Sequence, residues 1–241
     1  MSKGSFITRT PKTIPGLTLW LDAADASTIT IATGVSSWLD KSGNGFNPTQ
    51  ATGGSQPAYT ANLQGGLPGL VFDGVNDIMM TASNSTKMEP GTGFMSIFIV
   101  SKLTTSTSLY NYGKGRENAT SSANGWANSD ARLQAGTSAP ATNMGSSSII
   151  TLPETNASIK EWYFTGTTLD YLKDGASFGT QKSYSASVDS ASVLAIGGRP
   201  SLTLFASFSA FEFIIYNVGL STGQRQQVRQ YLGNKWGVTT S

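Results

Sequence analysis

Residues 17–25 (LTLWLDAAD) and 208–237 (FSAFEFIIYNVGLSTGQRQQVRQYLGNKWG) decide the fold of this chain. In the first stretch, leucines alternate with a threonine and a tryptophan, and this period of two predicts a β-strand with one apolar face. The second stretch opens with a long apolar run and continues into a segment with helix signals. We therefore expect the two ends of the chain to open and close one β-sandwich domain.

The composition favours an all-β domain of 241 residues. Charged residues make up only 12% of the chain, about half the share expected of a soluble globular protein. The polar surface must come instead from 32 Ser and 29 Thr, and 27 Gly provide for tight turns. This mixture suits strands with hydroxyl-bearing outer faces and suits long helices poorly.

The strand-like segments in between predict the core. Residues 94–102 (FMSIFIVSK) are apolar on both faces, as expected of a central strand. Residues 69–73 and 78–80 predict a hairpin, and the strand at 169–173 ends at Asp174-Gly175, a hairpin-turn dipeptide. The predicted core residues are Phe98, Val100, Phe164, Ile196, Phe213 and Ile215.

One short helix is predicted near the C-terminus. Ser221 and Gln224 form a capping-box pair, in which each side chain satisfies a backbone donor at the helix start. Val228, Leu232 and Trp236 then recur at a spacing of four and give one apolar stripe, before Gly237 ends the helix.

Charge and cysteine content limit the partners. A net charge of +2 gives no field that would gather a polyanion, so we expect no nucleic acid. No cysteine is present, the apolar runs are too short to span a membrane, and no apolar leader is seen.

Residues 1–15 are predicted as an arm outside the sandwich of residues 16–238, with 239–241 as a tail. Lys3, Arg9 and Lys12 would serve the arm as an attachment segment or simply as a solvated end.

Together these segments resemble the concanavalin A-like lectin/glucanase superfamily, in the laminin-G-like form common in bacteriophage virion and bacterial surface proteins. The resemblance rests on LTLWLDAADASTI, VSSWLDKSGNG, QPAY, GLVFDGVND, LAIGGRP and FSAFEFIIYNVGLS, and it spans about residues 16–238. It implies a jelly-roll sandwich of two antiparallel sheets, with the final helix closing one edge. Such folds host lectins, hydrolases, adhesins and scaffolds, so the resemblance leaves the function open.

Enzymatic chemistry is not expected. Without histidine or cysteine, neither a Ser-His-Asp nor a Cys-His arrangement can form. A pair of carboxylates remains as the possible machinery of a glycoside hydrolase. The five Glu, however, do not match the E-x-D-x-E strand motif of the glucanase branch.

A metal site is the alternative for one loop. Residues 40–45 (DKSGNG) resemble the first half of a calcium-binding loop, but Ala51 stands where such a loop has its bidentate Glu. We interpret this segment as a structural turn and predict no cofactor, with calcium kept as the alternative.

Glycan binding needs an aromatic face beside amide or carboxylate groups. Trp126 meets that need together with four polar neighbours, namely Asn124, Asn128, Asp130 and Arg132. Tyr110 and Tyr112 share a face if the strand keeps a period of two. The alternative is that these aromatic side chains point into the core, as large apolar side chains usually do.

The sequence is most consistent with a non-enzymatic bacteriophage virion surface protein, either a capsid decoration or a tail adhesion module. Its composition resembles that of an exposed adhesin, while no signal peptide, cysteine or anchor is seen. The expected partners are other virion proteins, copies of itself on the particle and a host-surface glycan. The alternatives are a lectin domain of a bacterial surface protein and a glycoside hydrolase.

Overall fold

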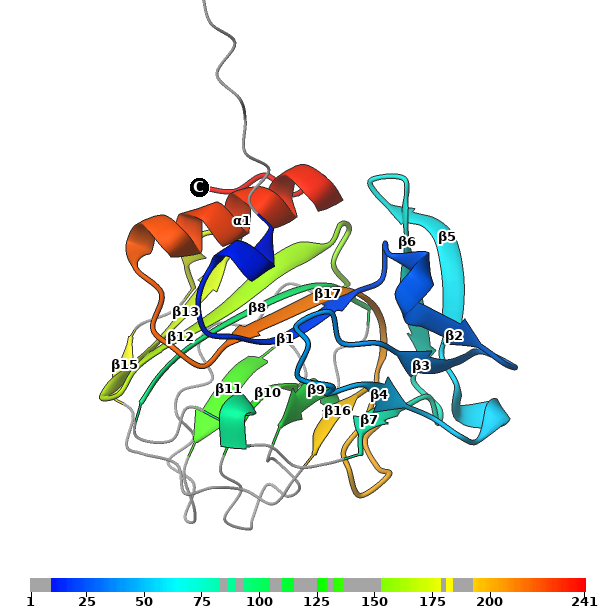
Figure 1. Ribbon diagram of the computed structural model, residues 1–241. Helices are drawn as coiled ribbons and strands as arrows, with labels where there is room; N and C mark the ends of the chain where they lie inside the picture. Colours follow the sequence, from blue (N-terminus) through cyan, green and yellow to red (C-terminus); the bar gives the residue numbers. More distant parts are fainter. Residues whose placement is uncertain are drawn as a thin grey trace, which may run out of the picture.

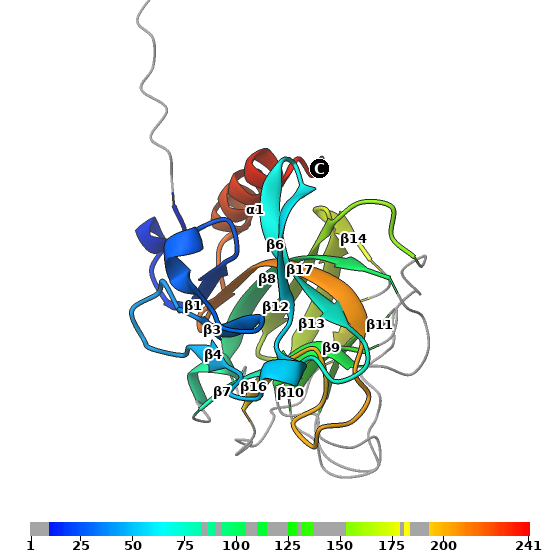
Figure 2. The same ribbon diagram turned by 90° about the vertical axis from the view of Figure 1, so that its right-hand side faces the viewer.

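The computed structural model describes residues 10–82, 86–89, 93–104, 110–114, 125–129, 132–136, 153–178, 181–183 and 193–241. Two antiparallel sheets face one another, and one helix lies on the outside of the first sheet (Figure 1). Figure 2 shows the same layers after a quarter turn, with the strands of the two sheets stacked below the helix. The predicted two-sheet antiparallel sandwich with one C-terminal helix is confirmed.

The first sheet has the order β14-β13-β12-β8-β17-β6-β5, with β1 also paired to β17 and β15 to β13. Its strands are β1 (Leu17–Asp22), β5 (Ala58–Gln64), β6 (Leu67–Asp73), β8 (Phe94–Leu103), β12 (Ser158–Thr165), β13 (Thr168–Lys173), β14 (Ala176–Ser177), β15 (Lys182–Ser183) and β17 (Ser207–Tyr216). The first and last strands of the chain, β1 and β17, are therefore neighbours in this sheet.

The second sheet has the order β11-β10-β9-β16-β7-β4-β3-β2. Its strands are β2 (Ile29–Ile31), β3 (Val35–Trp38), β4 (Pro48–Thr49), β7 (Met79–Thr81), β9 (Tyr110–Lys114), β10 (Gly125–Ser129), β11 (Arg132–Gly136) and β16 (Leu194–Ile196). In the described ranges, the 3-10 helix η1 (Pro11–Thr13) precedes β1, and three others connect strands: η2 (Ala26–Thr28), η3 (Gly53–Ser55) and η4 (Thr86–Met88).

Strand β8 separates two cores. Its alternate side chains Ile97 and Ile99 enter the main core between the sheets, while Phe98 and Val100 enter a second core on the outer face. All six predicted core residues are fully buried, which confirms the prediction. Phe164, Ile196, Phe213 and Ile215 lie in the main core, so the six side chains are divided between two layers.

Helix α1 (Thr222–Trp236) has the predicted ends. The Ser221 hydroxyl accepts a hydrogen bond from the backbone amide of Gln224, and Gln224 Oε1 accepts one from the backbone amide of Ser221. Gly237 takes the left-handed conformation at φ 67° and ends the helix. Its apolar stripe lies on the second core and so covers the outer face of β8 and its neighbours. The expectation that the helix closes an edge is therefore wrong, because β8 and β17 present apolar side chains on that face.

The predicted hairpin between residues 69–73 and 78–80 is also wrong, since β6 and β7 belong to different sheets. The Asp73 carboxylate accepts hydrogen bonds from the Val75 and Asn76 amides at 2.8 and 3.3 Å, and Asp77 accepts one from the Asp73 amide at 2.9 Å. These bonds support a wide corner that leads the chain from one layer to the other. By contrast, Asp174-Gly175 makes the predicted tight turn between β13 and β14.

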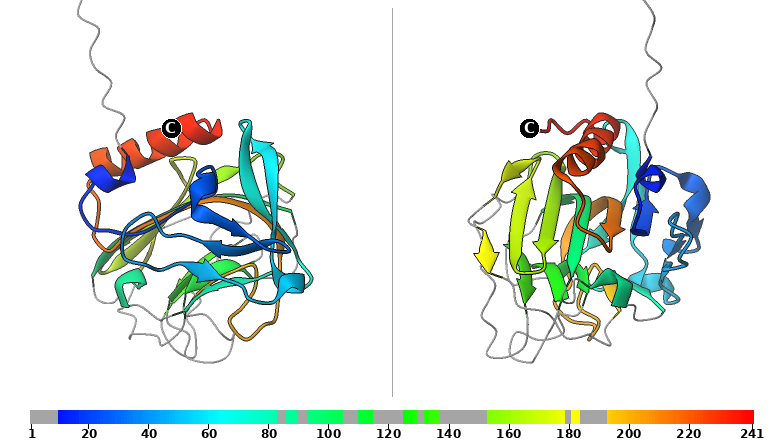
Figure 3. Two further views of the ribbon diagram at one scale, coloured as in Figure 1. Left: turned by 45° about the vertical axis from the view of Figure 1, so that its right-hand side comes forward. Right: turned by 60° about the vertical axis from the view of Figure 1, so that its left-hand side comes forward.

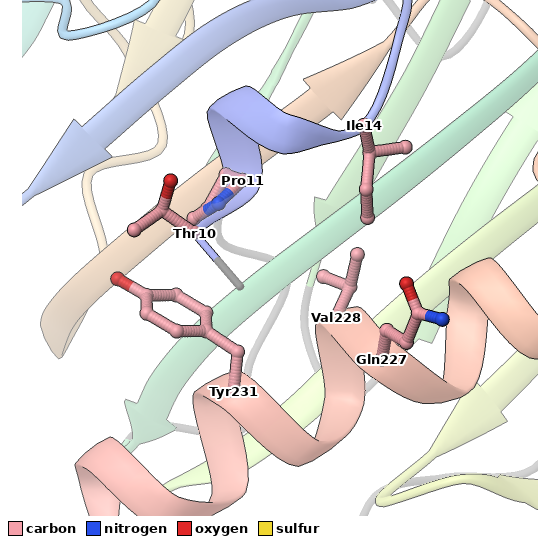
Figure 4. A pocket seen from close by; sticks show the side chains of 6 residues that line it. All are labelled: Thr10, Pro11, Ile14, Gln227, Val228 and Tyr231. Atoms are coloured by element: carbon pink, nitrogen blue, oxygen red, sulfur yellow. The ribbon is translucent and has the colours of Figure 1, made fainter. Parts of the chain in front are cut away.

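Residues 10–14 belong to the folded domain, which corrects the predicted arm of residues 1–15. Pro11 and Ile14 are buried against α1, and the Tyr216 hydroxyl donates to the Pro11 carbonyl at 3.1 Å. Figure 4 shows Pro11 and Ile14 lining a small hollow together with Val228 and Tyr231 of the helix. Lys12 is exposed on η1, and Lys3 and Arg9 lie outside the described residues.

The tail is also in contact with the fold, since the Ser241 amide donates to the Asp174 carbonyl at 3.0 Å. Of the helices in the described ranges, none has the length and apolar character needed to cross a membrane.

We expect Phe213→Ala to lower the free energy of unfolding by about 3–5 kcal/mol, because it removes a ring from the main core and leaves a cavity. Val75→Ala is the matched control, since Val75 is 71% exposed. Urea denaturation of the three proteins checks this. Equal midpoints for Phe213→Ala and the parent would contradict the core assignment.

A chain that begins at residue 15 should be less stable than one that begins at residue 10. The shorter chain loses the buried Pro11 and Ile14 side chains, and burying an isoleucine contributes about 1.5–3 kcal/mol. Thermal melts of the two truncated chains measure the difference. Identical melting temperatures would show that this segment contributes nothing to the fold.

Candidate functional site

Trp126, the predicted sugar-binding residue, is completely buried. Its indole Nε1 donates to the Met88 carbonyl at 2.9 Å, and its ring lies 5.7 Å from that of Trp162 in the main core. No face of the ring is open to a ligand. The sugar-binding interpretation of Trp126 is thus wrong, and the core alternative holds because β10 turns this side chain between the sheets.

Tyr110 and Tyr112 are buried as well, and they lie in different clusters. The pairing of β9 with β10 shifts register between Asn128 and Ser129, so β9 has a bulge between the two tyrosines. A bulge adds one residue and breaks the period of two. Tyr112 therefore enters the main core, where its hydroxyl lies 3.0 Å from the Ser101 hydroxyl, while Tyr110 contacts a small cluster with Ile78.

The four polar residues predicted around Trp126 do not form a described site. Asn124 and Asp130 lie outside the described residues, and Asn128 and Arg132 are described only as backbone in β10 and β11. Most of the segment between residues 104 and 148, where ligand contacts are predicted, lies outside the described residues.

The loop at residues 40–45 is a structural turn. The Asp40 carboxylate accepts hydrogen bonds from the Trp20 amide at 3.0 Å, from the Ser42 amide and hydroxyl at 2.8 and 2.7 Å, and from the Phe46 amide at 3.2 Å. The Asn44 amide group donates to the Thr18 carbonyl at 2.9 Å. Its polar groups are therefore engaged within the fold. The part of the chain that the structure describes contains no cluster of three or more acidic residues suited to a metal.

Glu212, on β17, is a fully buried carboxylate that holds four donors. Its Oε1 accepts from the Trp20 indole at 2.7 Å and the Tyr231 hydroxyl at 2.8 Å, and its Oε2 accepts from the Trp236 indole at 2.7 Å and Lys235 Nζ at 2.8 Å. Burial raises the pKa of Glu212 above its ordinary value, and the Lys235 ammonium opposes that effect. The donors come from β1 and α1, so this carboxylate joins the two ends of the chain.

The same network continues to the surface through two lysines. Lys235 Nζ also lies 2.5 Å from Asp22, and Lys41 Nζ bridges Asp22 at 2.8 Å and Asp25 at 2.7 Å. Hydrogen bonds from Lys41 and Ser27 lower the pKa of Asp25 to about 2. Each carboxylate in this group already has a cationic partner, which is the arrangement of a structural network.

Three other buried carboxylates are paired in the same way. Lys160 Nζ lies 2.7 Å from Glu154, and burial lowers the pKa of this lysine. Glu89 pairs with Lys114, and Glu161 accepts from Arg225 and Arg229. The two Glu161 pairs connect β12 with α1, while Glu89 and Glu154 lie just after η4 and just before β12 and pair with lysines of β9 and β12.

One face of the first sheet is only partly covered. The register places Ser96, Tyr163 and Asp170 in one row across β8, β12 and β13, and places Phe94 beside Thr165 in the next row. The side chains of both rows point to the helix side, because their alternate neighbours lie in the main core. Helix α1 covers the part of this face near Phe98 and Ile159 and does not extend over the C-terminal end of β12 and the N-terminal end of β13 (Figure 3, right). The side chains of this uncovered part, Tyr163, Thr165, Thr168 and Asp170, are half-buried.

Phe94 is the exposed aromatic of this open area, with 54% of its surface accessible. One side of the ring contacts Gly219, whose missing side chain leaves room for it, since a Cβ there would come within 2.7 Å. Val218 beside it is also exposed. The ring is thus held at its edge by the connection between β17 and α1, and its remaining surface faces solvent.

Polar groups lie on the same face of the sheet as this ring. The Thr165 and Thr168 hydroxyls lie 2.6 Å apart, the Gln181 amide donates to Asp170 Oδ2 at 3.1 Å, and the Arg225 guanidinium lies 4.1 Å from the centre of the Tyr163 ring. We call this set the outer patch: Phe94, Tyr163, Thr165, Thr168, Asp170, Gln181 and Arg225. It combines an apolar ring with hydroxyl, amide and carboxylate groups, which is the chemistry that a sugar ring and its hydroxyls need.

The outer patch has no direct signal in the sequence. Phe94 begins the apolar run that predicts a central strand, and the structure places it at the start of β8. The alternation of a β-strand places Phe94 on the same face as Phe98, as the structure also does. Only the position of α1 shows that the face is covered at Phe98 and open at Phe94.

Comparisons with known proteins establish the fold. No protein-family model and no curated protein sequence matches this chain. Among solved structures, Trypanosoma rangeli sialidase is similar at a TM-score of 0.58 and 15% identity, over 95% of this chain and 34% of the sialidase. The binding domain of Paraclostridial Mosquitocidal Protein 1 is similar at a TM-score of 0.61 and 12% identity, over 93% of this chain and 54% of that one.

A third similar structure matches as a whole domain. Domain 4 of AbnA, a GH43 extracellular arabinanase from Geobacillus stearothermophilus, was solved in complex with arabinotriose and has a TM-score of 0.59 at 14% identity. The match covers 89% of this chain and 97% of that domain, whereas this chain spans only about a third of the sialidase. The likeness shows a shared β-sandwich fold.

We expect Lys41→Met to raise the pKa of Asp25 from about 2 towards its usual value of 3.8. Because the folded-state pKa is lowered, the stability that this carboxylate contributes is present above about pH 4 and is lost as the pH falls towards 2. Titration of the Asp25 carboxyl carbon by NMR measures the shift. Lys41→Arg is the control that keeps the cation, and an unmoved pKa in Lys41→Met would contradict the ion pair.

Proposed function

We propose that this chain is a non-enzymatic carbohydrate-binding β-sandwich module that contacts its glycan through the outer patch. The observation that carries the proposal is the exposed Phe94 ring, which the register pairs with Thr165. The same face of the sheet carries Thr168 and Asp170, and Asp170 is hydrogen-bonded to Gln181. A sugar presents C–H groups to an aromatic ring and hydroxyls to such polar groups. The whole-domain likeness to an arabinanase domain solved with arabinotriose supports this function over the alternatives.

A binding role is also supported by the state of the buried carboxylates. Glycoside hydrolysis needs an acid and a second carboxylate that face the same substrate. Glu154, Glu161 and Glu212 are instead buried and bonded to lysine or arginine, and Asp22 is held by two lysines. We therefore propose that the module binds glycan without cleaving it.

The finer proposal is a place on the surface of a bacteriophage virion, as a capsid decoration or tail adhesion module of the laminin-G-like, concanavalin A-like kind. It is supported by the sequence resemblance and by a surface rich in Ser and Thr with only 12% charged residues. Copies of this chain, other virion proteins and a host-surface glycan are the proposed partners. A lectin domain of a bacterial surface protein is the second candidate, and immunogold labelling of purified particles separates the two.

The binding proposal is tested with Phe94→Ala on a glycan array, followed by calorimetry on the glycan that the parent binds. We expect affinity to fall about tenfold or more, since burying a phenylalanine side chain contributes about 1.5–3 kcal/mol. The fold should be unchanged, because Phe94 is mostly exposed.

Two controls accompany that experiment. Phe94→Tyr keeps the ring and should keep most of the affinity, while Val75→Ala removes an exposed apolar side chain elsewhere and should bind as the parent does. Undiminished binding by Phe94→Ala would show that the glycan contacts another surface. Binding to no glycan by the parent would refute the function itself.

A further inference from the structure

The charges of the outer patch select between classes of glycan, and this step rests on the proposed function. The arginine side chains at the patch are already hydrogen-bonded to a carboxylate of the protein. Arg225 donates to Glu161 at 2.5 Å and lies over the Tyr163 ring, and Arg229 donates to the other oxygen of Glu161 at 2.9 Å. The side chains of these two arginines are only 12% and 9% exposed. Neither guanidinium is therefore presented to a ligand as a free cation.

The negative group of the patch, the Asp170 carboxylate, is hydrogen-bonded to a neutral side chain. Asp170 lies on β13 at the open side of Tyr163, and the hydrogen bond that the structure gives its carboxylate comes from the neutral Gln181 amide at 3.1 Å. The hydroxyls of Thr165 and Thr168 beside it are neutral as well. Among the described side chains of the outer patch the cation is Arg225, which is engaged by Glu161, so a carboxylate on the ligand would meet the like charge of Asp170.

Neutral sugar hydroxyls fit the same groups well. Asp170 can accept from a sugar hydroxyl, the Gln181 amide can donate to one, and the two threonine hydroxyls can do either. Two like charges about 4 Å apart in water repel by about 1 kcal/mol, which corresponds to about a fivefold loss of affinity. We infer that the outer patch binds neutral glycans and discriminates against acidic glycans through the Asp170 carboxylate.

The test uses an array on which every acidic polysaccharide is printed beside its carboxyl-reduced, neutral form. The parent should bind the neutral member of a pair at least fivefold more tightly than the acidic member at low salt. Added salt should reduce this preference, because exposed charges are screened at high ionic strength. Asp170→Asn keeps the size and a hydrogen-bond acceptor for Gln181, and it should bring the two affinities within about twofold.

The outcomes separate the two proposals. Preferential binding of acidic glycans that is lost in Phe94→Ala would overturn the inference about charge and leave the binding function standing. A preference for neutral glycans that persists in Asp170→Asn would also overturn the inference, because another group would then carry the discrimination. An array without any bound glycan would refute the binding function together with the inference.

Discussion

A buried carboxylate on the last strand determines how this domain is assembled. Glu212 has no contact with solvent, and a charge in that position is costly unless donors surround it. Its donors are Trp20 from β1 and Tyr231, Lys235 and Trp236 from α1. The two ends of the chain must therefore meet on the outer face of β17. Burial of the apolar stripe of α1 in the second core stabilises the packing of the helix on the sheet, and the hydrogen bonds to Glu212 fix where the helix lies.

That position of α1 decides which part of the first sheet remains open. A helix of 15 residues is about 22 Å long and covers only part of a broad sheet. It shields Phe98, Val100 and Ile159, and it begins beside the row that contains Tyr163. The C-terminal end of β12 and the N-terminal end of β13 therefore keep their hydroxyl and carboxylate groups half-buried on the uncovered part of this face, which also carries the exposed Phe94. The outer patch is thus a consequence of the same contacts that stabilise the fold.

Much of the architecture follows from local rules that the sequence obeys. The run of residues 94–102, apolar on both faces, predicted the central strand β8, Ser221 and Gln224 predicted the helix start, and Asp174-Gly175 predicted a tight turn. Each of these features depends on residues that are close in sequence. The corner at Asp73 and Asp77 resembles a hairpin turn locally, yet the partners of β7 are β4 and β16. The residues of the turn do not determine which distant strands pair with β7.

The sequence by itself determined the fold class, the helix with both of its ends and the absence of histidine and cysteine chemistry. Only the tertiary structure decided which aromatic side chains are open. Trp126 has polar neighbours in sequence and is buried between the sheets, while Phe94 begins an apolar run and is exposed beyond the helix. The reason is physical: burial depends on what lies above a side chain, and in a sandwich those atoms come from segments far away in the chain. A bulge in β9 puts Tyr110 and Tyr112 in different clusters, and the placement of one helix leaves the Phe94 ring exposed.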